Sequence, residues 1–385
     1  MPLADLKAEL ELSYTFDCSC GECEQFPNLA DYNADAISGI MANMAEQVWR
    51  EKGSDGTINR EATIAFAQQL WNGVLSGYGD NFTSVDYNTP DWNMLASLRQ
   101  NVWHFSAAKN YAQLRELSSA LIGEDGKLVS KAAFIAAAMK INADFSKHFG
   151  ATEYELAVAG SQMASKWATI KQDDILEFDA IIDGQTTALC ASLHGTRLPA
   201  SSSFWNKYYP PNHWRCRSTV RIVYGGSITP AGEIPGADIP PMFQTNLGKA
   251  GLIFPAAHPY FKDIPAGIAL QAMAALRKEL MHESKERLQG KTVEVDGLGT
   301  VGFSSKSIKE IFNQPHAEYM LKNQLAYVSD TLLANSTVVA NSKDSKGDAK
   351  LFHYLQVDGL PNNYLVVKEF EDGRKVLYSI VDGLK

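Results

Sequence analysis

The chain has 385 residues and a mass of 42.3 kDa, which is too large for one ordinary hydrophobic core and predicts two or three domains. Hydrophobic residues make up 45% and charged residues 21%, which excludes a wholly disordered protein. The net charge of −9 argues against an extended phosphate-binding surface. No apolar run reaches the roughly 18 residues needed to cross a bilayer, and the first residues lack the apolar core of a signal peptide. We therefore expect a cytoplasmic location without membrane contact.

The N-terminal region, residues 1–140, predicts mostly helix. Apolar side chains repeat at helical spacing along DAISGIMANMAEQVWREKG, and the pattern continues through REATIAFAQQLWNGVL. Before these helices, the stretch CSCGEC contains Cys18, Cys20 and Cys23. A closed zinc site needs four ligands, and no fourth ligand is close in sequence. Two interpretations stay open: reduced surface thiols in a turn, or a metal site that a distant ligand completes.

Residues 141–267 combine a helix, short strands and a long irregular segment. Thr152 and Glu155 predict a capping box at the start of the helix, just after Gly150. Between residues 175 and 223, β-prone runs such as ILEFDAII and RSTVRIVY alternate with glycine, proline and serine breaks. Residues 225–268 are too long and too apolar for a flexible linker. We expect them to form an ordered arm that wraps over the preceding residues.

A connector helix over residues 268–290 leads to a C-terminal domain over residues 291–385. KTVEVDGLGTVGFS predicts a hairpin with Asp296-Gly297 at its turn. SKSIKEIFN and AEYMLKNQLAYVSDTLL predict helices, and FHYLQV, NYLVVKEF and KVLYSIV predict three antiparallel strands. The expected fold class is α+β and multidomain: a mainly helical N-terminal part, a small irregular α/β domain with its arm, and C-terminal helices on an antiparallel sheet.

The stretch FWNKYYPPNHWRCRSTV, residues 204–220, concentrates aromatic, proline, histidine and cysteine residues. Three other segments accompany it. A predicted helix that starts with Thr152-Glu153-Tyr154 and ends at Trp167 comes first, DGQTTALCASLHGTRLP precedes the stretch, and FQTNLGKAGLIFPAAHPYF follows it. In this order the motifs resemble those of the Mu F-like phage head morphogenesis (minor capsid) proteins, over roughly residues 140–265. The resemblance implies a phage or prophage protein of the virion head that acts in procapsid assembly near the portal. It also implies portal and capsid proteins as partners, and assembly in the host cytoplasm.

The chain departs from this family pattern at positions that bear on metal binding. Cys190 stands where many members have histidine, His194 stands where aspartate is usual, and Ser218 replaces the last cysteine of a Cys-Arg-Cys motif. A zinc site built on the family's histidine and cysteine positions would therefore consist of Cys190, His194, His213 and Cys216.

The alternative is a clasp without metal. Pro210-Pro211 would fix the backbone, Trp205, Tyr208 and Trp214 would fill a small core, and the thiols would be buried apolar groups. No nucleophile in this stretch is paired with a base and an orienting acid at a recognisable spacing, so we expect no catalysis here.

The C-terminal residues, from about Thr292 to Val381, are similar to the phage-associated members of the barnase–EndoU–colicin–RelE nuclease group. The similarity rests on Gly302-Phe303-Ser304, Gln314-Pro315-His316 and Tyr378-Ser379-Ile380, and it implies a toxin-like fold that cleaves RNA without a metal. Such cleavage needs a base, an acid and a group that holds the phosphate charge. The candidate catalytic residues are His316, Lys368, Ser379 and His353, with Lys350 as a substitute for the last.

Two functions stay open at this point. The chain is either a head protein that delivers an endoribonuclease effector, with RNA as substrate and an immunity protein as partner, or a structural head protein whose C-terminal domain is an inactive binding module. Residues 291–385 carry 11 basic and 12 acidic side chains, which favours the second, since RNases usually present a basic surface. ADP-ribosyl transfer is a third possibility, for which Glu369 and Glu371 are available without the rest of the pattern. Zinc is the one cofactor that the sequence suggests.

Overall fold

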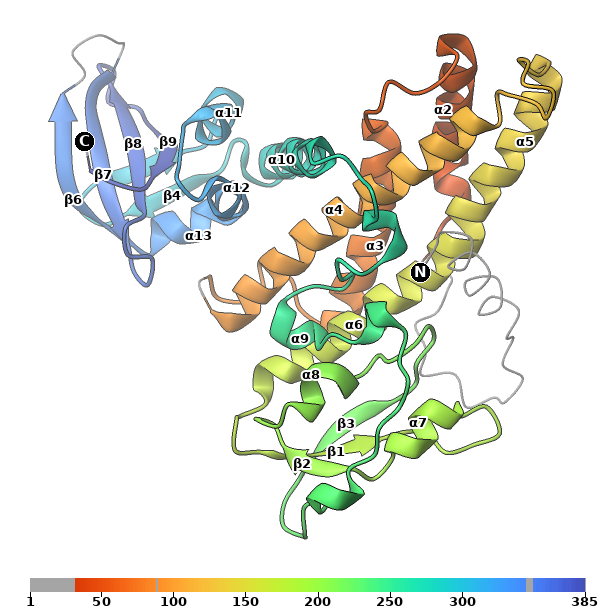
Figure 1. Ribbon diagram of the computed structural model, residues 1–385. Coiled ribbons are helices and arrows are strands. Elements are labelled where there is room, and N and C mark those ends of the chain that lie inside the picture. The colour runs from red at the N-terminus through yellow and green to blue at the C-terminus, as the bar shows by residue number, and fades with distance from the viewer. Residues whose placement is uncertain (1–31, 88, 344–348, 385) are drawn as a thin grey trace. The chain divides into compact units, whose positions relative to one another are not determined.

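The computed structural model describes residues 32–87, 89–343 and 349–384, which form two compact units (Figure 1). The first unit holds the described residues up to Asn81 together with Ser97–Ala272, and the second holds Phe82–Ala96 and the residues from Met273 onwards. The fold is α+β and multidomain, as predicted. Cys18, Cys20 and Cys23 lie outside the described residues. None of the helices in the described part of the chain has the length and apolar character that a membrane span requires.

Helices dominate the first unit. They are η3 (Asp35–Ile37), α2 (Ser38–Glu51), α3 (Arg60–Tyr78), the part of α4 (Pro90–Ser119) from Ser97 onwards, α5 (Lys131–Ala143), the π-helical turn η4 (Asp144–His148) and α6 (Phe149–Thr169). Helices α3 and α6 approach each other closely, because a Cβ atom on Gly77 would lie only 2.2 Å from the carbonyl oxygen of Val158. Glycine at this position is therefore required by the packing.

The predicted capping box at Thr152 is wrong. α5, η4 and α6 follow one another without a break, so Thr152 lies inside α6, where its Oγ1 donates to the carbonyl of His148 at 3.4 Å. Glu155 forms an ion pair with Arg215 at 2.7 Å instead of capping the helix. Gly150, which suggests a break in the sequence, is accommodated within the first turn of α6.

One ion pair is fully buried among the helices of the first unit. Lys109 of α4 donates to a carboxylate oxygen of Glu153 in α6, and the two side chains are 1% and 0% exposed. Burial raises the pKa of Glu153 to about 7, although Lys109 counteracts the rise. Burial likewise lowers the pKa of Lys109 against the attraction of Glu153. The pair links α4 to α6 in the core of the unit.

A small antiparallel sheet follows in the chain. Its strand order is β2 (Arg197–Pro199), β1 (Ile175–Asp179) and β3 (Thr219–Val223), and the short helices α7 (Ala188–Leu193) and α8 (Phe204–Tyr208) accompany it (Figure 1). Leu176 and Phe178 of the central strand are fully buried in a core that also contains Trp205 and Tyr209. The sheet and these helices form the part that resembles the head morphogenesis family.

The arm over residues 225–268 is ordered and packs on the preceding residues of the same unit. It contains η5 (Ala231–Glu233), η6 (Pro241–Phe243), α9 (Leu247–Ala250) and η7 (Pro259–Phe261). The side-chain amide of Asn246 donates to the carbonyl of Trp205 at 3.0 Å. The ring of Phe254 stacks on Phe105 of α4 with 3.6 Å between the centroids. Polar and aromatic contacts therefore hold the arm in place, as its composition predicts.

The second unit is a six-stranded sheet with helices on one face (Figure 1). The strand order is β4 (Thr292–Val295), β5 (Gly299–Gly302), β9 (Lys375–Val381), β8 (Tyr364–Phe370), β7 (Ala349–Val357) and β6 (Ser336–Lys343). The helices of this unit are α11 (Ser305–Asn313), α12 (Tyr319–Tyr327), α13 (Ser329–Ala334) and the later turns of α10 (Gly267–Leu288). The hairpin, both helical segments and the last three strands are confirmed. β6 was not predicted, because its sequence STVVANSK carries small and polar residues on an edge strand.

Residues Phe82–Ala96 are an unexpected part of this second unit. The ring of Phe82 lies 5.4 Å from that of Trp92 and 6.5 Å from that of Tyr327 in α12. The side-chain amide of Gln324 donates to the carbonyl of Ala96 at 3.3 Å. A segment that is distant in sequence therefore completes the C-terminal core.

Candidate functional site

Most aromatic residues of the stretch 204–220 are buried, and Tyr208 is partly buried against their core. Trp205 is fully buried, and its indole Nε1 donates to the carbonyl of Pro199 at 3.0 Å. Tyr209 is also fully buried, and its hydroxyl donates to the carbonyl of Met163 in α6 at 2.9 Å. Trp214 packs edge-on against Phe243 of the arm at 5.3 Å. We call this stretch the clasp, because its side chains join the small sheet, α6 and the arm.

A group of three metal-ligand side chains lies beside the clasp. Cys190 of α7 and Cys216 of the clasp are buried free cysteines whose Sγ atoms are 3.8 Å apart. The Nε2 atom of His213 lies 3.2 Å from Sγ of Cys190. One ligand atom from each of the three residues lies within 4.8 Å of the others. Three of the four residues predicted for a zinc site therefore meet.

The structure does not bring His194 to this group. Its Nδ1 accepts a hydrogen bond from the backbone N–H of Ala180 at 3.1 Å, and the carboxylate of Asp179 lies 3.9 Å away. α7 ends at Leu193, so the i,i+4 spacing from Cys190 does not place both side chains on one helix face. His194 is exposed and helps to close the turn after β1.

The two thiols bind their protons unequally. The hydrogen bond with Cys190 lowers the pKa of Cys216 to about 6, against the effect of burial. The same contact, together with burial, raises the pKa of Cys190 to about 12. For His213, burial acts against protonation, but the contact with Cys190 and the bond to the Trp214 carbonyl leave its pKa raised. One thiolate is thus favoured in the group, and the thiolate is the form of cysteine that binds metals.

Sequence reasoning missed two residues that support this group. The Thr187 side chain caps α7, accepting from the backbone N–H of Cys190 at 3.3 Å, and it also lies 3.2 Å from Nε2 of His213. Arg217 binds both carboxylate oxygens of Asp183, at 2.6 and 2.5 Å. A threonine three residues before Cys190 is a recognisable N-cap signal, whereas the Arg217–Asp183 pair joins residues 34 positions apart and has no local signature.

In the second unit, the predicted catalytic residue His316 lies between α11 and α12. Its Nε2 contacts the side-chain oxygen of Asn363 at 3.1 Å, and its Nδ1 accepts from the backbone N–H of Glu318 at 3.0 Å. It also lines a hollow of about 210 Å³ together with Gln314 and Asp382. The site offers a histidine beside a carboxylate, but both ring nitrogens already have partners within the chain.

His353 and Ser379 are inside the sheet. His353 bonds to Asn341 at 2.7 Å and to Glu369 at 2.8 Å. Ser379 is 1% exposed, and its hydroxyl donates to the carbonyl of Ile380 at 3.3 Å. Lys368 is half-buried, with its Nζ 5.1 Å from the centre of the Phe370 ring. The bonds given above for His353 and Ser379 do not involve His316.

The length of β8 separates the two histidines. Asn363, the partner of His316, stands just before the strand, and Glu369, the partner of His353, stands near its end. His353 pairs with Val367, four residues after Asn363, and four residues of extended chain span about 13 Å. The two histidines therefore have different partners at different positions along β8.

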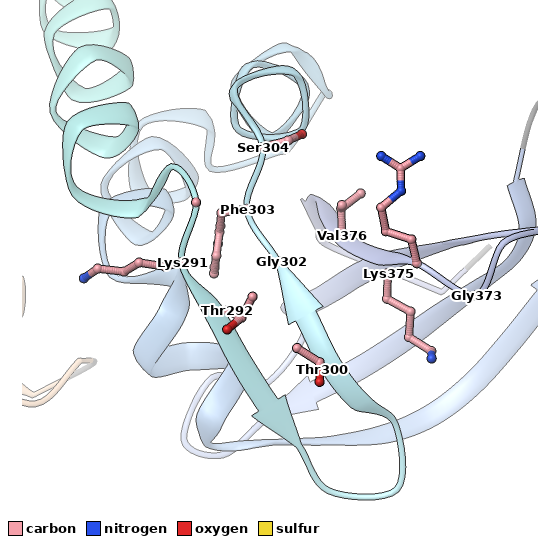
Figure 2. A pocket seen from close by; sticks show the side chains of 11 residues that line it. Lys291, Thr292, Thr300, Gly302, Phe303, Ser304, Gly373, Lys375 and Val376 are labelled. Atoms are coloured by element: carbon pink, nitrogen blue, oxygen red, sulfur yellow. The ribbon is translucent and has the colours of Figure 1, made fainter.

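A second hollow in this unit, of about 420 Å³, lies beside the β4–β5 hairpin (Figure 2). Its lining includes Lys291, Thr292, Thr300, Arg374 and Lys375. The predicted catalytic residues do not line it. Two of the three cationic side chains that line it are paired with carboxylates, Lys291 with Asp330 and Arg374 with Asp372, each at 3.7 Å.

The fold and the clasp define a two-unit α+β protein whose first unit carries a Cys–His–Cys group. Residues 126–221 match the family model described as "Phage Mu protein F like protein", and residues 271–378 match "Large polyvalent protein-associated domain 3". A curated relative, "Putative capsid assembly protein F" of Escherichia phage Mu, is 38% identical over 47 residues, which are 12% of this chain and 11% of that protein. The matched part thus spans about a tenth of the length of this relative. Comparison with solved structures gave no match.

Proposed function

We propose that the chain acts in phage or prophage head morphogenesis, as a minor head protein that assembles with capsid and portal proteins. The observation that carries the proposal is the match of residues 126–221 to the Mu F-like family. This range contains β1, β2, α7, α8, the clasp and the start of β3, so the similarity covers most of a folded piece and not an isolated motif. The name of the phage Mu relative points to the same process.

The test is the presence of the chain in assembled heads. Heads purified from a lysate of the phage or prophage that encodes the chain should contain it at a reproducible stoichiometry by quantitative mass spectrometry. Trp205→Ala, which empties the core beneath the clasp, should lower its incorporation, whereas His194→Ala should not. Heads that form normally and lack the chain would contradict the proposal.

For the second unit, we propose a binding module that accompanies the head protein. His353 and Ser379 are engaged inside the sheet, His353 and His316 have different partners at different positions along β8, and residues 291–385 carry no net basic charge. All three observations support a surface that binds a partner more than one that cleaves RNA. The match of residues 271–378 to a domain associated with large polyvalent proteins agrees with an accessory role. Heads should therefore still form after removal of residues 291–385.

A metal-independent endoribonuclease is the second candidate, because His316 lines a hollow with Asp382 and could act as acid or base there. The full chain, its His316→Ala variant and a His282→Ala control should be incubated with tRNA and total RNA in EDTA. His282 suits the control because it is exposed on α10, where it pairs with Glu286, one turn away, at 3.4 Å. The nuclease would be established if the chain cleaves RNA, His316→Ala abolishes the cleavage and His282→Ala preserves it. An immunity partner would then be expected. No cleavage by the folded chain supports the binding module.

A further inference from the structure

We propose that Cys190, His213 and Cys216 bind one Zn²⁺ ion, which ties α7 to the clasp. The separations of the ligand atoms support this assignment. Tetrahedral coordination with Zn–S distances of about 2.3 Å places two sulfur ligands about 3.8 Å apart, and a sulfur and a nitrogen ligand about 3.5 Å apart. The two Sγ atoms are 3.8 Å apart, and Nε2 of His213 is 3.2 Å from Sγ of Cys190.

The imidazole of His213 is oriented as a ligand. Its Nδ1 lies 2.7 Å from the carbonyl oxygen of Trp214, and a carbonyl can only accept, so Nδ1 carries the proton. Nε2 is then left with a lone pair, and this atom faces Cys190. A backbone carbonyl that fixes the tautomer of a histidine is the usual outer contact of a zinc ligand.

The burial and chain positions of the two thiols favour metal ligands over unbound surface thiols. Cys190 is 3% and Cys216 is 5% exposed, and they come from two segments that are 26 residues apart in the chain. α7 has only six residues, so few backbone hydrogen bonds hold it. A shared ion would add a strong tie between this short helix and the clasp. The thiols are not joined to each other, because a disulfide would require an S–S distance of about 2.05 Å.

The fourth coordination position is left to water. Among the residues that the structure describes, no further histidine, cysteine, aspartate or glutamate joins the group. The nearby carboxylate of Asp183 is taken by Arg217, which binds both of its oxygens. The protein therefore provides a Cys₂His set, which zinc accepts with one exchangeable position.

The experiment uses the full chain with Cys18, Cys20 and Cys23 replaced by serine, so that any thiolate–metal bond must involve Cys190 or Cys216. The protein is purified under reducing conditions, its zinc content is measured by mass spectrometry of the metal, and Co²⁺ is then titrated into the zinc-depleted protein. We expect one zinc per chain and a thiolate-to-cobalt absorption band with the intensity of a tetrahedral site. Cys190→Ser and Cys216→Ser, each in the same background, should weaken Co²⁺ binding at least tenfold. His194→Ala is the matched control and should bind as tightly as the background protein.

The background protein is the chain with the three serine replacements. The proposal would be overturned if this protein contained no zinc and also gave no thiolate–cobalt band. A Cys190–Cys216 disulfide in the reduced preparation would overturn it as well. Co²⁺ binding by both serine variants as tight as that of the background protein would do the same. If a serine variant does not fold, the X-ray absorption spectrum of zinc in the background protein decides instead. Two sulfur and at least one imidazole ligand support the site, and a sulfur-free shell refutes it.

Discussion

The buried pair Lys109–Glu153 allows the most quantitative test of the core of the first unit. Replacement of either residue by methionine leaves the other ionisable group fully buried without its partner. Breaking a buried ion pair in this way costs about 3–5 kcal/mol of the free energy of unfolding. The double variant Lys109→Met/Glu153→Met removes both charges at similar volume, so its stability should lie within about 2 kcal/mol of the unsubstituted chain. The sum of the single effects should thus exceed the double effect by at least about 4 kcal/mol.

The effect of Lys109→Met should also depend on pH. The pKa of Glu153 is already raised to about 7 in the folded chain, and loss of the lysine, which lowers it, should raise it further. A carboxyl group with a raised pKa in the folded state contributes its full stability below the unfolded pKa of about 4.5 and loses it as the pH rises through the folded pKa. The loss amounts to about 1.4 kcal/mol per pH unit over that range. In Lys109→Met the decline should continue above pH 7.

Urea unfolding followed by tryptophan fluorescence is a suitable assay. The chain has seven tryptophans, and Trp92 is the one that falls in the second unit, so the signal reports mainly on the first. Unfolding is measured at pH 6 and pH 8 for the unsubstituted chain, both single variants and the double variant. Additive single effects, or a penalty for Lys109→Met that shrinks as the pH rises, would refute the reasoning.

Three further predictions concern packing and internal hydrogen bonds. Gly77→Ala should destabilise the first unit by about 1–3 kcal/mol in urea unfolding, because its Cβ would lie 2.2 Å from the carbonyl oxygen of Val158. The control Gly39→Ala, which has open space around it in α2, should stabilise the unit by about 0.5–1 kcal/mol. Equal effects of the two variants would contradict the close contact of α3 with α6. Trp205→Ala should cost about 3–5 kcal/mol in the same assay, and a loss below 1 kcal/mol would show that the clasp is not part of the core. His353→Ala should lower the free energy of unfolding of the second unit by about 1–3 kcal/mol in thermal unfolding, because the bonds to Asn341 and Glu369 are lost. Lys350→Ala removes a half-exposed ion pair with the same Glu369 and should cost less than about 1 kcal/mol. A larger loss for Lys350→Ala than for His353→Ala would be inconsistent with the buried position of His353.

Local patterns predicted most of the secondary structure. The Asp296-Gly297 turn, the amphipathic run SKSIKEIFN and the alternation in NYLVVKEF each carry their own signal, and the structure confirms all three. The capping box at Thr152 failed because the helical geometry of η4 carries the chain past Gly150, so that no new helix starts there. Side-chain patterns cannot reveal such continuity, because the same local sequence is compatible with a threonine that caps a helix and with one inside it.

Long-range assembly was less accessible from the sequence. Residues Phe82–Ala96 look like the start of an N-terminal helix, but they complete the C-terminal core through contacts with residues more than 220 positions away. In the candidate metal centre, Cys190, His213 and Cys216 could be named from residue type and motif order. His194 could not be excluded, because its position depends on where α7 ends and on a hydrogen bond from Ala180.

The central claim is that the Mu F-like part of the chain functions in head assembly. The most direct measurement is a count of heads by electron microscopy in lysates of the encoding phage or prophage after deletion of the whole gene, with complementation in trans. We predict that deletion sharply reduces correctly formed heads, and that the full chain restores them while the Trp205→Ala variant restores fewer. Normal heads in normal number without the chain would contradict the account.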